Sequence, residues 1–244
     1  MNHTKHFSLY STLLSVILVF LFGSAVLAGP PLICRPFDIG NAKSLPFQGP
    51  DWSAVPASYD VSRLVGDTMA LLQPDTPVIV RMETIRRATI YARNNPEVAD
   101  ALLQRLRARV VGLKDKERRD PEALAAFFDL GYLVETYRQA AWISGHASKP
   151  YWSFKQSDPK DLDGYALVTK AISRGGGPEM EFAAALITFD LGYVGQDKKR
   201  TAFEEHVQKA VAGAKEESLL AKNLETHFGG EVKTLRAKAL AEKH

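Results

Sequence analysis

The side chains best suited to acid–base chemistry belong to a motif that occurs twice. Phe-Asp-Leu-Gly-Tyr spans residues 128–132 and recurs at residues 189–193. On a helix, Asp129 and Glu135 fall on one polar stripe, and Asp190 is the counterpart of Asp129. These three carboxylates could serve as an acid–base or ligand-binding set. Their repetition favours the alternative, in which the aspartates are packing elements that hydrogen-bond to neighbouring helix ends or tyrosine hydroxyls.

Aromatic side chains gather near the longest irregular segment of the chain, between residues 145 and 163. If they are exposed, they could stack on a sugar ring or offer a large contact area to a partner. The alternative is a loop that its own aromatic residues pin to the core. The candidate ligand-binding residues are Trp142, His146, Tyr151, Trp152 and Phe154.

Motifs of known catalytic or metal-binding chemistry are absent from the sequence. No His-Glu-x-x-His pair and no Gly-x-Ser-x-Gly elbow occurs, and no P-loop lysine follows Gly175–Gly177. The acidic segment before Gly164 fails as a calcium loop, because Pro159 and Lys170 fall where carboxylates are required. We therefore expect no metal and no cofactor, and we favour a protein that is not an enzyme.

Cys34 is the only cysteine, so it cannot form a disulfide within the chain. It could be a buried or idle thiol, an intermolecular disulfide partner, or a lipid attachment site. The bulky Ile33 before it departs from the small residue that lipidation signals carry. The sequence therefore favours the simple thiol.

Local signals predict that the body of the chain is all-α. Proline follows a capping residue or a glycine at Pro77, Pro96, Pro121 and Pro178, which is typical of a first helical turn. Apolar residues between these points recur at helical spacing, and no stretch alternates as a strand does. We expect stacked antiparallel helical hairpins, as in irregular helical-repeat proteins. The expected helices are 60–72, 77–93, 96–113, 121–144, 164–174, 178–194, 199–215, 217–228 and 231–242.

Residues 29–59 form a proline-rich arm that precedes the helical domain, residues 60–244. The prolines of residues 30–56 exclude a helix or a central strand there. The same stretch is too apolar for a free linker, so we predict an extended arm that buries its apolar side chains on the helices. A flexible tether is the alternative.

Gly131 and Gly192 lie in the interior of expected helices, at the same place in the two motif copies. A glycine costs about 1 kcal/mol relative to alanine in a helix interior. Its use at both positions predicts a close crossing of two helices that a side chain would obstruct.

The first 28 residues have the organisation of a signal peptide. Lys5 precedes the apolar run Leu13–Phe22, and Ala25–Ala28 supplies small residues for cleavage. An uncleaved membrane anchor is the alternative, and both place the working part outside the cytoplasm, in a periplasm or the extracellular space. The formal net charge of +3, with both signs mixed along the helices, argues against a nucleic-acid partner.

These features lead to two functional hypotheses. The first is an exported helical scaffold or protein-interaction protein, because such folds present extended surfaces to partners. The second is an envelope enzyme or a carbohydrate- or peptidoglycan-binding protein that uses the 142–154 aromatic segment. Membrane association is expected only if the N-terminal segment stays uncleaved or Cys34 carries a lipid.

Overall fold

A computed structural model describes residues 31–48, 54–113, 120–146, 159–189 and 196–241, and all regular structure in these residues is helical. The predicted all-α fold of packed helices is therefore confirmed. The helices are α2 (Pro31–Cys34), η1 (Val61–Arg63), α3 (Leu64–Leu71), α4 (Val78–Ala92), α5 (Pro96–Val111), α6 (Pro121–His146), α7 (Gly164–Ser173), α8 (Pro178–Phe189), α9 (Gln196–Gly213) and α10 (Leu219–Ala241).

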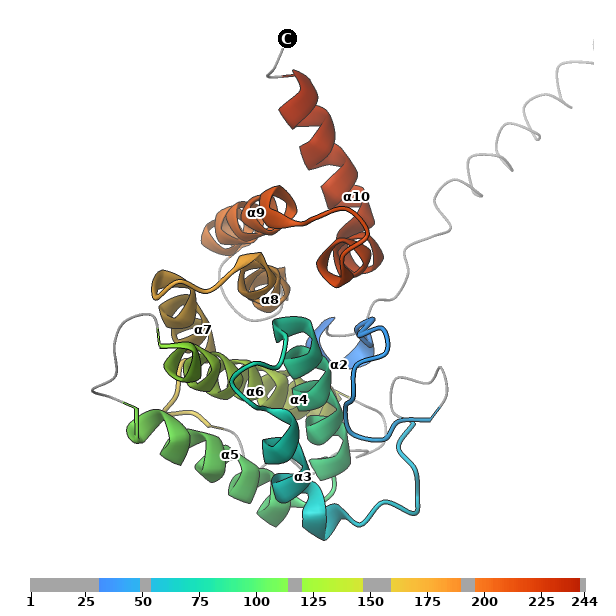
Figure 1. The fold of residues 1–244 in the computed structure, drawn as a ribbon, viewed down its shortest axis with the longest axis vertical. Coiled ribbons are helices and arrows are strands. Elements are labelled where there is room, and N and C mark those ends of the chain that lie inside the picture. Colours follow the sequence, from blue (N-terminus) through green and yellow to red (C-terminus); the bar gives the residue numbers. More distant parts are fainter. Residues whose placement is uncertain (1–30, 49–53, 114–119, 147–158, 190–195, 242–244) are drawn as a thin grey trace, which may run out of the picture.

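Helix α6 lies at the centre of the helical array (Figure 1). Helices α4, α5 and α7 pack against it, and the short helix α2 also contacts it. Helix α8 packs closely against α9, and α10 contacts both at the opposite end from α3 and α5. Because α6 touches so many neighbours, its side chains are buried around most of its circumference.

Helix α10 carries a kink where the sequence predicted a break between two helices. Phe228 has non-helical dihedral angles, with φ −135° and ψ 27°, directly before Gly229 and Gly230. The helix resumes after the kink, and its second half points away from the body (Figure 1).

Side-chain capping marks several of the helix starts. The side chain of Asn95 accepts a hydrogen bond from Val98 N at 3.1 Å, where α5 begins with Pro96. Asp163 caps α7 in the same way. The capping role predicted for Thr76 is wrong, because its hydroxyl donates instead to the carbonyl of Leu71 at 2.8 Å. Leu71 ends α3, so Thr76 satisfies one of the carbonyls that a helix C-terminus leaves unpaired.

Residues 31–48 are the first described part of the predicted 29–59 arm and are called the arm from here on; they lie along the helical body beside α4 and α10 (Figure 1). The expectation that no helix forms in this stretch is wrong for the single turn α2. Pro31 is the first residue of that turn, where a missing amide donor costs nothing. Buried apolar side chains anchor the arm to the core, namely those of Leu32, Ile33, Phe37, Ile39 and Leu45.

Gly131 marks a close crossing between α6 and α7. A Cβ atom on Gly131 would lie 2.6 Å from the carbonyl oxygen of Gly164 and 2.8 Å from Cβ of Leu167. A Cβ atom on Gly164 would lie 2.5 Å from the carbonyl oxygen of Gly131. The two backbones therefore touch through a pair of glycines. Gly192 lies outside the described residues.

We expect that Gly131→Ala lowers the thermal midpoint of unfolding, although alanine is the better helix former. The helical gain is about 1 kcal/mol, whereas overpacking costs about 1–3 kcal/mol, and the obstructing Gly164 oxygen is backbone that cannot rotate away. Gly145→Ala, also in α6, is the matched control because a Cβ there would meet nothing within 4 Å. Calorimetry should show a loss only for Gly131→Ala, and an equal gain in both variants would rule out the packing role.

No helix in the described ranges combines the length and the apolar composition needed to cross a membrane. The predicted signal peptide, residues 1–28, lies outside those ranges.

Candidate functional site

Asp129 joins three helices through two arginines. Its Oδ2 atom accepts hydrogen bonds from Arg81 of α4 at 2.7 Å and from Arg109 of α5 at 3.1 Å. The side chains of Asp129 and Arg81 are 0% and 2% exposed. Burial raises the pKa of the Asp129 carboxyl, and the two guanidinium groups act against that rise. Its Oδ1 atom has no hydrogen-bond partner within the described residues.

The arginines of this cluster also hold the end of α3. Arg81 donates to the carbonyls of Thr76 and Gln73, and Arg109 donates to the carbonyl of Leu72 at 3.1 Å. Leu72 and Gln73 directly follow α3, whose last carbonyls lack partners within the helix. The cluster therefore fixes the side chain of Arg109 relative to α3, α4 and α6.

A hollow of about 590 Å³ opens beside Arg109. Its volume lies within the range of small-ligand sites, about 300–1,000 Å³. Arg105 lies one helical turn from Arg109 and is exposed, with no ion pair or hydrogen bond to the described part of the chain. The hollow is lined by Met69, Ala70, Leu72, Gln73, Pro74, Arg105, Ala108, Arg109 and Glu122.

The charges at this hollow favour an anionic ligand. Of the residues that line it, Arg105 and Arg109 contribute two positive charges against the one carboxylate of Glu122. A guanidinium group matches a carboxylate or phosphate with two parallel hydrogen bonds. The remaining walls are mostly apolar, so the site suits an anionic group attached to a small apolar one. We call it the arginine hollow.

The other members of the predicted polar stripe lie elsewhere. Glu135 is largely buried, pairs with Arg138 at 2.5 Å, and accepts the backbone N–H of Tyr165 at 3.1 Å. Burial raises the pKa of Glu135, while Arg138 opposes the rise. Glu135 thus supports the α6–α7 crossing and does not line the arginine hollow. Asp190 lies outside the described residues.

The predicted aromatic segment is described only at its beginning. The side chain of Trp142, near the end of α6, is 40% exposed. His146 is the last residue of α6, and its side chain is outside the described part of the structure. Tyr151, Trp152 and Phe154 also lie outside the described residues.

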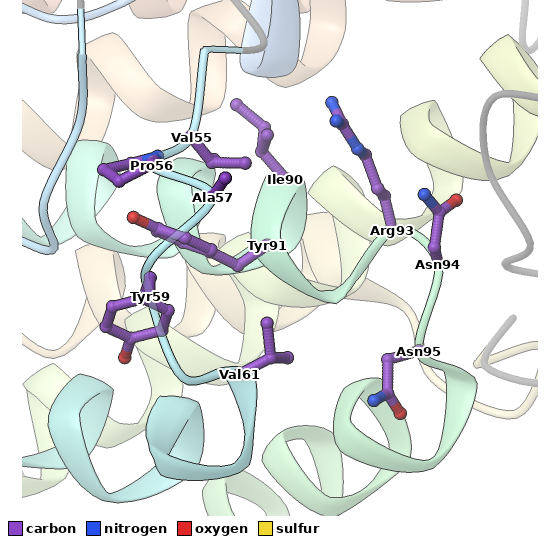
Figure 2. Close-up of a pocket in the computed structure, with 10 residues that line it drawn as sticks. All are labelled: Val55, Pro56, Ala57, Tyr59, Val61, Ile90, Tyr91, Arg93, Asn94 and Asn95. Atoms are coloured by element: carbon purple, nitrogen blue, oxygen red, sulfur yellow. The ribbon is translucent and has the colours of Figure 1, made fainter.

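A second hollow, of about 330 Å³, lies between the segment after the arm and the end of α4 (Figure 2). The rings of Tyr59 and Tyr91 form part of its wall, with centroids 4.3 Å apart. Both hydroxyls already donate, that of Tyr59 to Asp67 and that of Tyr91 to the carbonyl of Pro46. Figure 2 shows Arg93 and Asn94 at the other side. With its tyrosine donors already used, this hollow offers fewer free polar groups than the arginine hollow.

The fold also assembles a hydrogen-bonded relay that the sequence did not reveal. Tyr165 OH lies 2.8 Å from His206 Nε2, and His206 Nδ1 lies 2.5 Å from Glu181 Oε2. This order of groups resembles a nucleophile, its base and an orienting carboxylate. However, burial and the nearby Glu181 raise the pKa of Tyr165, which makes the phenolate harder to form. We interpret the relay as a polar connection among α7, α8 and α9.

Cys34 is poorly suited to nucleophilic chemistry. Burial raises the pKa of the Cys34 thiol to about 11, so near neutral pH it stays protonated and is a poor nucleophile. Within the described ranges, no group of three histidine, cysteine, aspartate or glutamate side chains could hold a metal ion.

Comparisons with protein families, with curated proteins and with solved structures found no match to this chain.

Only part of the arginine hollow could have been found from the sequence. The spacing of Arg105 and Arg109 places both on one face of α5. Their position beside α3 and Asp129 depends on the tertiary fold, since Asp129 lies 48 residues from Arg81 and 20 from Arg109.

Proposed function

We propose that this protein is an exported helical interaction protein that binds a carboxylate-bearing partner in the arginine hollow. The observation that carries the proposal is the exposed Arg105, which makes no ion pair with the described residues, beside a rigidly held Arg109 at a hollow of about 590 Å³. Export is inferred from the signal-like organisation of residues 1–28.

A fixed arginine beside an exposed one suits the capture of a carboxylate. Arg109 is held by Asp129 and by the carbonyl of Leu72, so little conformational entropy is lost when it binds a ligand. Arg105 can then close on the same anion, because side chains four residues apart on a helix are neighbours.

The apolar wall favours a polypeptide chain end over a free inorganic anion. Met69, Leu72 and Pro74 face the hollow and could receive an apolar terminal side chain. A C-terminal carboxylate with a leucine-like last residue would use both parts of the site. The partner class is therefore a protein with an accessible, apolar C-terminus.

Arg105→Gln should weaken such binding by about 10- to 100-fold, because a hydrogen bond to a charged group contributes about 1.5–3 kcal/mol. The probe is a random hexapeptide library with free carboxyl ends, compared with the same library amidated. Affinity selection followed by fluorescence titration measures the difference. The free-acid peptides should be selected and the amidated peptides should not.

Arg107→Gln is the matched control for this experiment. Arg107 lies on the same helix but pairs with Asp161 and does not line the hollow. If free-acid and amidated peptides bind equally, or if both variants lose affinity alike, the carboxylate site is rejected.

A carbohydrate-binding function is the second candidate, supported by the 40% exposure of Trp142 at the start of the aromatic segment. The same protein should then bind peptidoglycan fragments, with an affinity that Arg105→Gln leaves unchanged. The two functions are thus separated by one variant and two probes.

A further inference from the structure

The second hollow and the arginine hollow lie at opposite ends of the same two helices, α3 and α5. The second hollow is lined by Val61, which begins the short turn before α3, and by Asn95, which directly precedes α5. The arginine hollow is lined by Met69 near the end of α3 and by Arg109 near the end of α5. Because α3 and α5 contact each other, they form the surface between the two hollows.

The length of α5 sets the separation of the hollows. Asn95 and Arg109 are about 21 Å apart along the helix axis, since each helical residue rises about 1.5 Å. An extended peptide advances about 3.3 Å per residue, so about six residues span this distance. A chain whose terminal carboxylate is held by Arg109 and Arg105 would therefore bring its seventh residue from the end to the second hollow.

The surface between the hollows carries small side chains. On α5, Ala101 lies one turn before Arg105 and is exposed. On α3, Gly66 lies one turn before Ala70; both are exposed, and a Cβ atom on Gly66 would meet nothing within 4 Å. This surface leaves room for a peptide backbone to run from one hollow to the other.

The walls of the second hollow favour an aromatic side chain. Its volume of about 330 Å³ suits one large side chain better than a folded segment. The rings of Tyr59 and Tyr91 form part of the wall, beside the apolar side chains of Val55, Pro56 and Ile90 (Figure 2). Both tyrosine hydroxyls are hydrogen-bonded, which holds the rings in place. Aromatic pairs gain energy beyond the apolar area that they bury, so fixed rings favour an aromatic partner.

The opposite side of this hollow offers amide groups to a peptide backbone. Figure 2 shows Asn94 and Asn95 together at that side. The side-chain oxygen of Asn95 caps α5 by accepting from Val98 N, which leaves its NH₂ group to donate. Asn94 is exposed and makes no side-chain hydrogen bond within the described part of the chain. A backbone entering the hollow would thus find both donors and an acceptor.

We propose that the second hollow is a subsite for the same partner, and that it receives an aromatic side chain about six residues before the partner's C-terminal residue. The inference rests on the proposed function, because the carboxylate in the arginine hollow is its fixed point. It narrows the partner class to proteins whose C-terminal tail is extended, ends in an apolar residue and carries an aromatic residue upstream. Binding at the first hollow makes binding at the second intramolecular, so the tail gains affinity from both.

The test uses the full-length protein and peptides with free carboxyl ends. A hexapeptide selected by the protein is kept fixed, and six random residues are added at its N-terminal side. Selection should enrich phenylalanine, tyrosine or tryptophan within one position of the seventh residue from the C-terminus. The selected dodecapeptides should bind about tenfold more tightly than the hexapeptide, the gain expected of a buried aromatic anchor. Alanine in place of that aromatic residue should return the affinity to that of the hexapeptide.

Ala57→Trp tests where the added residues bind. Ala57 is exposed and lines the second hollow, so an indole ring there would occupy the hollow without displacing a buried side chain. Ser58→Trp is the matched control, because Ser58 is also exposed but does not line the hollow. Ala57→Trp should abolish the tenfold gain and leave the hexapeptide affinity unchanged, which also verifies that the variant is folded. Ser58→Trp should change neither affinity, and Arg105→Gln should weaken both peptides.

The outcomes separate the subsite from the carboxylate site. If the hexapeptide binds through Arg105 but its extension brings no gain, the subsite is rejected and the carboxylate site stands. A gain that survives Ala57→Trp assigns the added residues to another surface, which also overturns the subsite. If no peptide with a free carboxyl end binds, both are rejected.

Discussion

Replacing Glu83 by glutamine should lower the free energy of unfolding by about 3–5 kcal/mol, the range for removing one partner of a buried ion pair. Glu83 accepts hydrogen bonds from Arg86 at 2.8 Å and 3.0 Å and from Arg87 at 2.7 Å. Without its carboxylate, the wholly buried guanidinium of Arg86 keeps its charge and loses its counter-ion. Glutamine offers one acceptor oxygen to the donors that the carboxylate now serves, namely Arg86, Arg87 and the N–H of Phe37, so the hold on the arm is weakened together with the body.

Urea unfolding at neutral pH measures this loss, and limited trypsin digestion reports on the arm separately. Cleavage after Arg35 and Lys43 should accelerate in Glu83→Gln. Glu97→Gln is the control, because Glu97 is an exposed first-turn residue of α5 whose loss should cost less than about 1 kcal/mol. A similar small loss in both variants would show that the Glu83 cluster contributes little to stability.

Acidification should remove about 3 kcal/mol of stability through His227 alone. Burial lowers the pKa of this histidine from 6.5 to about 4 in the folded protein, and each pKa unit is worth about 1.4 kcal/mol. Above pH 6.5 the ring is neutral in both states, so the full stability is present. As the pH falls from 6.5 toward 4, the unfolded chain takes up a proton that the folded chain refuses, and stability is lost.

Urea midpoints measured between pH 7 and pH 4 test this prediction. Carboxylates also titrate in this range, so the informative quantity is the difference between wild type and His227→Gln. Glutamine cannot take up the proton, and its stability should fall less steeply with acidification. Parallel pH profiles for the two proteins would show that His227 is not responsible.

The sequence was most informative where structure is decided by neighbouring residues. The starts of α5, α6 and α8 follow from proline at the first helical position, and the crossing at Gly131 follows from a glycine inside an amphipathic pattern. The turn α2 runs against the proline content of its stretch, because Pro31 stands at its first residue. Proline excludes a helix interior but is tolerated in its first turn.

The charge clusters could be predicted only in part. Helix α4 is apolar around most of its circumference, which signals that its charged residues are buried and must be paired. Glu83, Arg86 and Arg87 stand at i, i+3 and i+4, a spacing that predicts their contact. Nothing local indicates that they also bind the arm, or that Asp129 would meet Arg81. These contacts join distant segments, and only the packing of helices brings them together.

The docking of the arm also determines when folding can finish. The arm leaves the ribosome before the helical body, and Asn223, which accepts a hydrogen bond from the N–H of Asp38, follows Asp38 by 185 residues. At about 5–20 residues per second, synthesis of that interval takes roughly 10–40 s. Throughout this time the binding site of the apolar arm is incomplete. The arm can dock fully only after α10 has been synthesised. The first part of the described chain to be made is therefore among the last to reach its native position.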